Sequence, residues 1–205
     1  MTYTLHKNDI PGNLDTGKEI AIDTETMGLC PERDRLCLAQ LSTGDGHAHL
    51  VQFCDRDYNA PNLKALLADQ TITKIFHFAR FDVAIFQKYL KVDCKSVYCT
   101  KIASKICRTF TDRHGLKSIC QDLLDVEISK ENQSSDWGKQ ELSNEQLKYA
   151  ASDVLYLHAI KEKLDTMLAR EGREHLAKNC FEFINTRAEL DLLGWRDKDI
   201  FSHSA

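Results

Sequence analysis

Two acidic residues, Asp23 and Glu25, follow directly on the apolar run Ile20–Ile22 and are separated by a single residue. Such a run is typical of a β-strand, in which residues two apart point to the same face. The two carboxylates would then lie side by side and repel each other unless a cation lay between them. Hard divalent ions such as Mg²⁺ take carboxylate oxygens and keep water and phosphate oxygens as further ligands. The pair therefore predicts a metal site at a strand end, with a solvated strand end as the alternative.

Two further acids, Asp82 and Asp153, could complete such a site. Asp82 falls in the first turn of a predicted helix, where the helix dipole favours a negative charge. Asp153 borders the apolar stripe of another helix, where an acid is costly unless it is paired, hydrogen-bonded or bound to metal. Tyr149 lies four residues earlier and shares its face of that helix. Taken alone, Asp82 is also explained as a helix-start acid and Asp153 as a border residue that reaches water.

The elements that must position these residues are predicted from the hydrophobic pattern and from turn signals. The short connections between the first three strands favour antiparallel pairing. A mixed five-stranded sheet flanked by helices follows, which makes the chain an α/β protein. Strands are predicted at 19–24, 35–42, 47–53, 74–77 and 96–98. Helices are predicted at 61–68, 80–90, 101–108, 116–124, from a capping box at Ser143 and Gln146 to Gly172, and at 173–190, with a polar loop at 129–138.

Length, net charge and cysteine content limit the classes of protein to which the chain can belong. A chain of 205 residues favours one domain with a sizeable core. Its net charge of −4 excludes a protein that coats long nucleic acid through charge alone, but it permits a small phosphate-bearing substrate bound through metal. The chain has neither a membrane-length apolar stretch nor a signal-peptide core at 1–18, so we expect a cytoplasmic location and no membrane partner. The eight irregularly spaced cysteines are typical of reduced, buried thiols.

Taken in chain order, the four acids and the tyrosine resemble the signature of the DEDD superfamily of 3′→5′ exonucleases, in the subgroup with a tyrosine in its third motif. The first motif is matched at 22–29 (IDTETMGL), the second at 77–82 (HFARFD) and the third at 149–154 (YAASDV). The segment SSDW at 134–137 resembles part of ribonuclease D. The chain is most similar to the stand-alone nanoRNase C type, which 111–117 and 192–195 also resemble.

This resemblance implies an RNase H-like sheet, the DnaQ-like exonuclease fold. It implies a single exonuclease domain over residues 1–205, without C-terminal HRDC domains. The implied activity is hydrolysis of short oligoribonucleotides, dinucleotides above all, from the 3′ end to nucleoside 5′-monophosphates. The implied assembly is a ring-shaped homo-oligomer, an octamer by family resemblance.

The resemblance also assigns roles to the five central residues. The four acids, Asp23, Glu25, Asp82 and Asp153, would hold two Mg²⁺ or Mn²⁺ ions. Two such ions about 3.5–4 Å apart stabilise both the attacking and the leaving oxygen of an in-line displacement. Tyr149 would position the attacking water, because an ordinary tyrosine pKa near 10 makes it a poor general base.

Further residues are expected to contact the substrate. Leu29 would wedge between the last two bases, as the matching residue does in relatives, and His77 and Phe81 would contact the terminal nucleotide. Core packing is an equally open explanation for Leu29 and Phe81. The full set of expected substrate contacts is Thr24, Met27, Gly28, Leu29, His77, Phe81, Arg108, Arg113, His114, Ser134 and Trp137.

Positive charge gathers in one part of the chain, which we term the basic stripe. On a helix, three of its members would share a face, and the others follow closely. The stripe could contact the 5′ phosphate of a dinucleotide and so stop a longer chain, whereas a solvated charged face is the alternative. Its members are Lys101, Lys105, Arg108, Arg113, His114 and Lys117.

Other functions remain open at this point. A broader exonuclease that trims structured RNA or DNA 3′ ends would carry the same motifs, and the fold cannot decide between them. A non-catalytic RNA-binding module would be expected to lack at least one acid, yet all four are present. An apolar tail, comprising Trp195, Ile200 and Phe201, fits either the protein's own core or a contact with another subunit.

Overall fold

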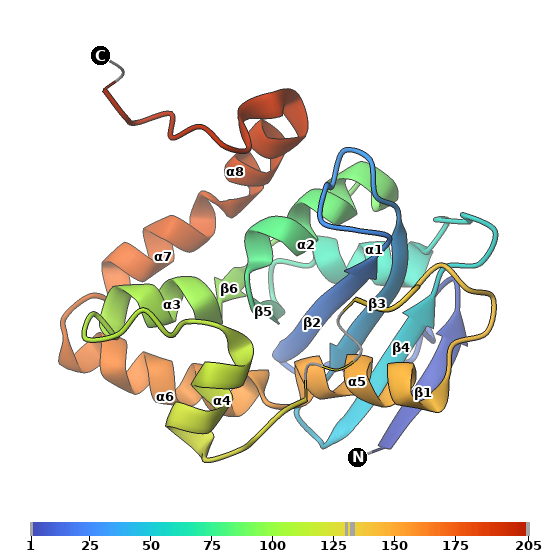
Figure 1. The fold of residues 1–205 in the computed structure, drawn as a ribbon, viewed down its shortest axis with the longest axis horizontal. Helices are drawn as coiled ribbons and strands as arrows, with labels where there is room; N and C mark the ends of the chain where they lie inside the picture. Colours follow the sequence, from blue (N-terminus) through green and yellow to red (C-terminus); the bar gives the residue numbers. More distant parts are fainter. Residues whose placement is uncertain (1, 130, 132–133, 204–205) are drawn as a thin grey trace.

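A mixed sheet of six strands forms the centre of the molecule in the computed structural model, which describes residues 2–129, 131 and 134–203 (Figure 1). The strand order is β1-β4-β3-β2-β5-β6. The strands are β1 (Thr2–Lys7), β2 (Glu19–Thr26), β3 (Leu36–Ser42), β4 (His47–Gln52), β5 (Thr73–Phe76) and β6 (Val97–Cys99).

Strands β2, β3 and β4 pair antiparallel, as their short connections predict. In this register Asp23 of β2 lies opposite Gln40 of β3. Strands β5 and β6 continue the sheet in parallel, and helices make the crossovers that parallel pairing requires.

The prediction of five strands is wrong by one, because no strand is predicted before residue 19 and the structure has β1 there. This strand lies at the edge of the sheet and pairs in parallel with β4. Most of its side chains are exposed, and only Tyr3 and His6 are half-buried. An exposed edge strand carries little of the apolar alternation that identifies strands in sequence, so only its pairing with β4 reveals it.

The predicted helices form, but four of them are broken or shorter than expected. The helix predicted from Ser143 divides at Tyr156, and the one predicted at 173–190 divides at Phe183. The one predicted at 80–90 becomes π-helical from Phe86, and the one predicted at 101–108 ends at Cys107. Residues 130, 132 and 133 of the predicted loop lie outside the described residues. The helices are α1 (Pro61–Ala68), α2 (Ala79–Ile85), α3 (Thr100–Cys107), α4 (Leu116–Leu124), α5 (Asn144–Leu155), α6 (Leu157–Arg170), α7 (Glu174–Glu182) and α8 (Ile184–Leu190), with π-helical turns η1 (Phe86–Leu90) and η2 (Asp191–Trp195).

Helix α5 starts where the sequence predicts. The Ser143 hydroxyl accepts from the Gln146 backbone N–H at 3.2 Å, and the Gln146 side chain accepts from the Ser143 N–H at 3.0 Å. This capping box satisfies two donors that the first helical turn leaves free. It fixes the first residue of the helix and therefore the face on which Tyr149 and Asp153 fall.

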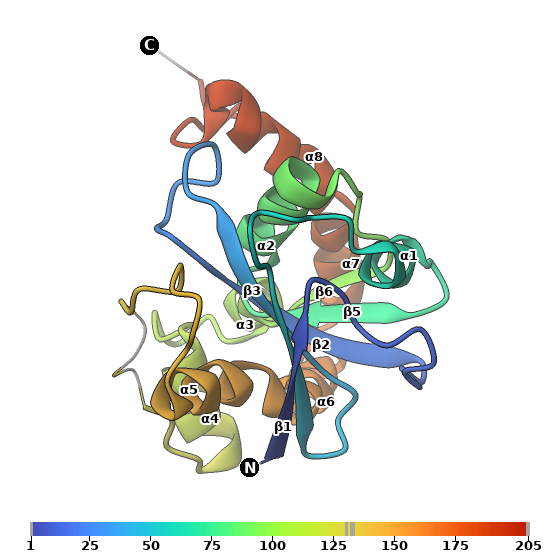
Figure 2. The ribbon, with the colours of Figure 1, turned by 90° about the vertical axis from the view of Figure 1, so that its right-hand side faces the viewer.

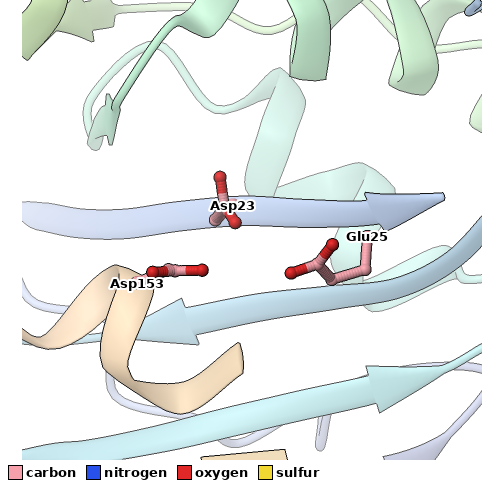
Figure 3. A group of neighbouring side chains, drawn as sticks. All are labelled: Asp23, Glu25 and Asp153. Carbon is pink, nitrogen blue, oxygen red and sulfur yellow. The ribbon is translucent and has the colours of Figure 1, made fainter. Parts of the chain in front are cut away.

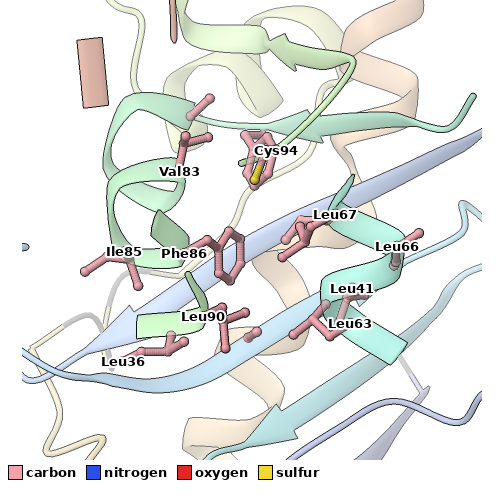
Figure 4. Packing of buried hydrophobic residues seen from close by; sticks show 14 of the residues in the cluster. Leu36, Leu41, Leu63, Leu66, Leu67, Val83, Ile85, Phe86, Leu90 and Cys94 are labelled. Carbon is pink, nitrogen blue, oxygen red and sulfur yellow. The ribbon is translucent and has the colours of Figure 1, made fainter. Parts of the chain in front are cut away.

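The sheet separates two hydrophobic cores, with α1 and α2 on one side and α5 and α6 on the other (Figure 2). Leucines of β3 and α1 pack with Val83, Phe86 and Leu90 in the first core (Figure 4). Alternation along β2 sends Ile20 and Ile22 into this core and turns the intervening positions toward α5. Among the described residues no helix combines the length and apolar character needed to cross a membrane.

Candidate active site

Three carboxylates meet where β2 passes α5. Asp23 and Glu25 project from the same face of β2, and Asp153 reaches them from α5 (Figure 3). One oxygen from each of the three lies within 4.8 Å of those of the other two. Three acids therefore meet at one point, because Asp23 and Glu25 share a face of the strand and Asp153 lies on the helix that covers this face.

A fourth acid, Asp82, lies nearby on α2. It is buried, and its Oδ1 accepts a 2.7 Å hydrogen bond from the hydroxyl of Thr24. Thr24 points away from Asp23 and Glu25, as the strand period requires, so its hydroxyl orients Asp82 from behind. Burial and then the Asp23 charge raise the pKa of Asp82, so the two carboxylates lie within electrostatic reach of each other.

The electrostatics of these acids differ from those of ordinary surface carboxylates. Burial raises the pKa of Asp23 to about 7, and a hydrogen bond from the Thr24 backbone N–H lowers this pKa by a smaller amount. Burial, followed by the charges of Asp23, Asp153 and Asp82, raises the pKa of Glu25 well above its usual value. None of the ion pairs between described residues involves these four carboxylates. Carboxylate oxygens are the ligands that a hard divalent cation prefers. The charge of such a cation would favour the ionised form of all four acids.

Tyr149 lies one helical turn before Asp153 and hydrogen-bonds its carboxylate through the phenol. Burial and then the Asp153 charge raise the pKa of Tyr149 further above its usual value, so the phenol stays protonated. The indole of Trp137 packs beside it, with ring centroids 6.1 Å apart. A protonated hydroxyl held at the edge of a carboxylate cluster can orient a water molecule but cannot take a proton from it.

The loop after β2 presents two apolar side chains to solvent beside the acids. Leu29 is 77% exposed and Met27 is 48% exposed, so neither is a core residue. Gly28 between them is required by packing, since a Cβ there would lie 2.3 Å from Oδ2 of Asp34. Asp34 in turn accepts from the backbone N–H of Cys30 at 3.0 Å. The loop is therefore held in a defined shape that directs Leu29 outward.

The segment around Trp137 packs against the same loop. A Cβ on Gly138 would lie 2.5 Å from the Met27 sulfur, and Arg35 donates to the Gly138 carbonyl at 3.1 Å. Trp137 is buried in the core beneath α5, whereas Ser134 is exposed. Of these two expected substrate contacts, Trp137 thus supports Tyr149, and Ser134 lies in the exposed loop.

The two expected nucleotide contacts around α2, His77 and Phe81, are both half-buried. His77 shares a 2.8 Å hydrogen bond with Thr100, and burial, with a smaller contribution from Lys101, lowers its pKa to about 3. Phe81 is half-buried against the first core. Phe78, which no sequence pattern predicts as a contact, is 42% exposed and has a left-handed backbone (φ 74°), with the Lys101 ammonium 4.4 Å from its ring centroid. Such a backbone is uncommon outside glycine, and sequence alone carries no signal for it.

The basic stripe is not one continuous face, which corrects the expectation for Arg108. Because α3 ends at Cys107, Arg108 turns inward, is only 2% exposed and pairs with Asp122 at 2.5 Å. It also donates to the Arg113 carbonyl at 3.2 Å and so shapes the loop that follows. His114 shares a 2.9 Å hydrogen bond with the hydroxyl of Ser104. Near this loop Lys105 and Arg113 are exposed, with Arg113 paired to Asp122 at 3.2 Å, and Lys101 is half-buried.

The sequence and the fold match those of known nucleases. The sequence pattern of the 3′-5′ exonuclease family matches residues 8–169, and the chain belongs to this family. Its sheet and helices are those of the DnaQ-like exonuclease fold, as the motifs predict. The resemblance to the ribonuclease D-like group and to its NrnC type is confirmed by the relatives that follow.

The structure of Brucella melitensis NrnC with bound Mg²⁺ is similar over 100% of both chains, with a TM-score of 0.95 and 55% sequence identity. The structure of the same protein bound to pGG gives a TM-score of 0.96 and 56% identity, also over 100% of both chains. Ribonuclease D of Acidiphilium cryptum is 31% identical over 154 residues, which are 75% of this chain. The chain spans 39% of the length of that curated relative.

Proposed function

We propose that this protein is a divalent-metal-dependent 3′→5′ exoribonuclease that hydrolyses short oligoribonucleotides, dinucleotides above all, to nucleoside 5′-monophosphates. The observation that carries the proposal is the cluster of Asp23, Glu25 and Asp153, which bring one oxygen each within 4.8 Å of one another and form no ion pair with a cationic side chain among the described residues. Asp153 is buried and the other two are half-buried, and carboxylates so close together are stable as a set when a cation binds between them.

In the proposed mechanism, Asp23, Glu25 and Asp153 hold the metal, and Asp82, oriented by Thr24, completes a two-ion site for Mg²⁺ or Mn²⁺. The ions would supply an activated water and stabilise the leaving 3′ oxygen. Tyr149 remains protonated and orients the water through its hydroxyl while hydrogen-bonded to Asp153.

Short substrates are supported by two features around the acids. Leu29 stands exposed on a fixed loop, where its side chain can separate the last two bases. Phe78 offers an exposed ring to a base, and Lys101, Lys105 and Arg113 offer charge to a 5′ phosphate. The structure of NrnC bound to pGG supports a short RNA substrate for this chain as well.

The proposal treats residues 1–205 as one exonuclease domain that assembles into a ring-shaped homo-oligomer, an octamer by family resemblance. Exposed apolar residues near the C-terminus support a subunit contact there: Leu193, Trp195, Ile200 and Phe201. Light scattering of the purified chain should then give a mass several times 23.4 kDa. A monomeric mass would remove the ring from the proposal and leave the chemistry untouched.

A length series of 5′-labelled RNAs, from dinucleotide to heptanucleotide, tests the activity with Mg²⁺ present. The expected result is release of mononucleotides from the 3′ end, with a sharp rate maximum at the dinucleotide. A flat profile, with comparable trimming of duplex DNA ends, would instead favour the broader exonuclease. Binding without any mononucleotide release would contradict the enzyme itself.

An Arg113→Ala variant tests the 5′-phosphate contact, with Lys178→Ala as an exposed lysine on α7 for comparison. The wild type should prefer a 5′-phosphorylated dinucleotide over an unphosphorylated one. Arg113→Ala should reduce this preference, whereas Lys178→Ala should not change it. An unaltered preference in Arg113→Ala would place the phosphate contact elsewhere.

A further inference from the structure

Gln40 is a polar side chain in the most deeply buried strand of the protein. Every residue of β3 is buried, and Gln40 has no exposed surface at all. Neither Nε2 nor Oε1 of its amide has a hydrogen-bond partner within the described part of the chain. A buried amide without partners is costly, and such groups in native proteins call for an explanation.

A second buried glutamine shows that the fold can satisfy such a group. Gln52, on the neighbouring strand β4, donates to the carbonyls of Lys139 and Gln140 at 2.9 and 3.2 Å. Its amide ties the loop after Trp137 to the sheet, which is a structural role. Gln40 makes no comparable contact with any residue that the structure describes, so a structural role of this kind does not account for its amide.

The position of Gln40 in the sheet indicates what the amide serves. In the antiparallel register it lies directly opposite Asp23 on β2, while its neighbour on β4 is Leu50. Side chains directly opposite each other on an antiparallel pair share one face, with Cβ atoms about 4.5–5.5 Å apart. This face lies beneath α5, the helix that carries Tyr149 and Asp153. The polar neighbour of the amide across the strand pair is therefore the carboxylate of Asp23.

We infer that Gln40 is a positioning residue for Asp23, an inference that rests on the proposed metal-dependent function. Its amide N–H would donate to one oxygen of the ionised Asp23 carboxylate and so direct the other oxygen toward the metal. Hydrogen-bond partners of metal ligands fix the orientation of those ligands and strengthen binding. An amide can do this without adding charge, whereas a fifth acid would repel the other four.

The test compares Gln40→Met with Gln52→Met, two substitutions that keep the length of the side chain and remove its amide. Mg²⁺ affinity is measured by calorimetry, and stability by thermal unfolding of the metal-free protein. Gln40→Met should keep or raise the unfolding temperature, because it removes an unpaired buried amide. It should weaken Mg²⁺ binding by about 10–100-fold and lower kcat in parallel. Gln52→Met should show the opposite pattern, a lower unfolding temperature with unchanged Mg²⁺ affinity.

Wild-type Mg²⁺ affinity in Gln40→Met would overturn the inference, and so would a loss of stability without a loss of affinity. Gln40→Leu serves as a second apolar variant, and failure of both to fold would also count against it. Asp23→Asn separates this inference from the proposed function. If Asp23→Asn loses Mg²⁺ binding and Gln40→Met does not, only the role of Gln40 falls. If Asp23→Asn binds Mg²⁺ like the wild type, the metal site itself is contradicted.

Discussion

Helix α2 takes part in two groups of buried charge, and they are built in opposite ways. Arg80 in its first turn donates through two nitrogens to Asp191, which is only 4% exposed and also accepts from Arg187 at 2.8 Å. Two residues further on, Asp82 lies within electrostatic reach of Asp23, and among the described residues no basic side chain forms an ion pair with either acid. One cluster contains its own counter-charge, and the other does not.

The two clusters show that a buried acid has a structural explanation when basic side chains pair with it. Asp191 joins α2 to the end of α8, so its burial is explained by the two guanidinium groups that it holds together. The carboxylates of Asp23, Glu25 and Asp153 repel one another, and burial raises the pKa of each. Removing a charge should therefore damage the first cluster and relax the second, while only the second should affect metal binding and turnover.

The largest expected effect is that of Asp23→Asn on turnover. The variant should lose activity by on the order of 10³-fold or more, because the proposed metal site loses one of its charged ligands and keeps only those of the other acids. Its metal-free form should unfold at the same or a higher temperature, since one of the mutually repelling charges is gone. Steady-state kinetics and thermal unfolding measure the two effects. Near-normal activity with Mg²⁺ would remove Asp23 from the metal site.

Asp191→Asn should produce the opposite pattern. It leaves Arg80 and Arg187 without their buried counter-charge, so the free energy of unfolding should fall by about 3–5 kcal/mol. Mg²⁺ affinity of the folded variant should stay unchanged. Denaturant unfolding and calorimetry measure these quantities, with the exposed Asp197→Asn as a control. A weakened Mg²⁺ affinity with normal stability would show that the two clusters are coupled through α2.

Tyr149→Phe tests the role of the phenol hydroxyl within the acidic cluster. The variant keeps the ring that packs beside Trp137 but loses the hydroxyl that bonds Asp153. We expect kcat to fall by about 10²-fold, with little change in Mg²⁺ affinity, because the hydroxyl orients water rather than metal. Rapid-quench kinetics at saturating dinucleotide would measure the step. If kcat is unchanged, Tyr149 takes no part in the mechanism.

The smallest effect is a pH dependence of metal-free stability. The pKa of Asp23 rises from 3.8 to about 7 on folding, so between these values the folded protein holds a proton that the unfolded chain has lost. Stability from this group is therefore complete below about pH 4 and declines as the pH rises toward about 7. Metal-free unfolding temperatures should be higher near pH 5 than near pH 8, and Mg²⁺ should offset the decline. Asp23→Asn should flatten the profile, and an unflattened one would assign the titration to another group.

Local sequence patterns predicted much of the fold and the candidate site. The period of two placed Asp23 and Glu25 on one face of a strand, and the capping box placed Tyr149 and Asp153 on one face of a helix. Where a pattern depends only on neighbouring residues, backbone geometry decides the outcome. The edge strand β1 and the break at Tyr156 were missed, because strand pairing and helix packing depend on residues far away in the chain.

The amino-acid sequence identified the residues that can do chemistry, namely four acids and a tyrosine whose order resembles the DEDD exonuclease signature. Only the tertiary structure decided which charges find partners. In the folded chain Arg108 turns inward and pairs with Asp122, and Arg80 pairs with Asp191. The amide of Gln40, which has no hydrogen-bond partner among the described residues, lies opposite Asp23. The physical reason is that a charge or an amide is satisfied by whichever group the register of the sheet and the packing of helices bring within hydrogen-bond reach. Spacing along the chain does not contain that information.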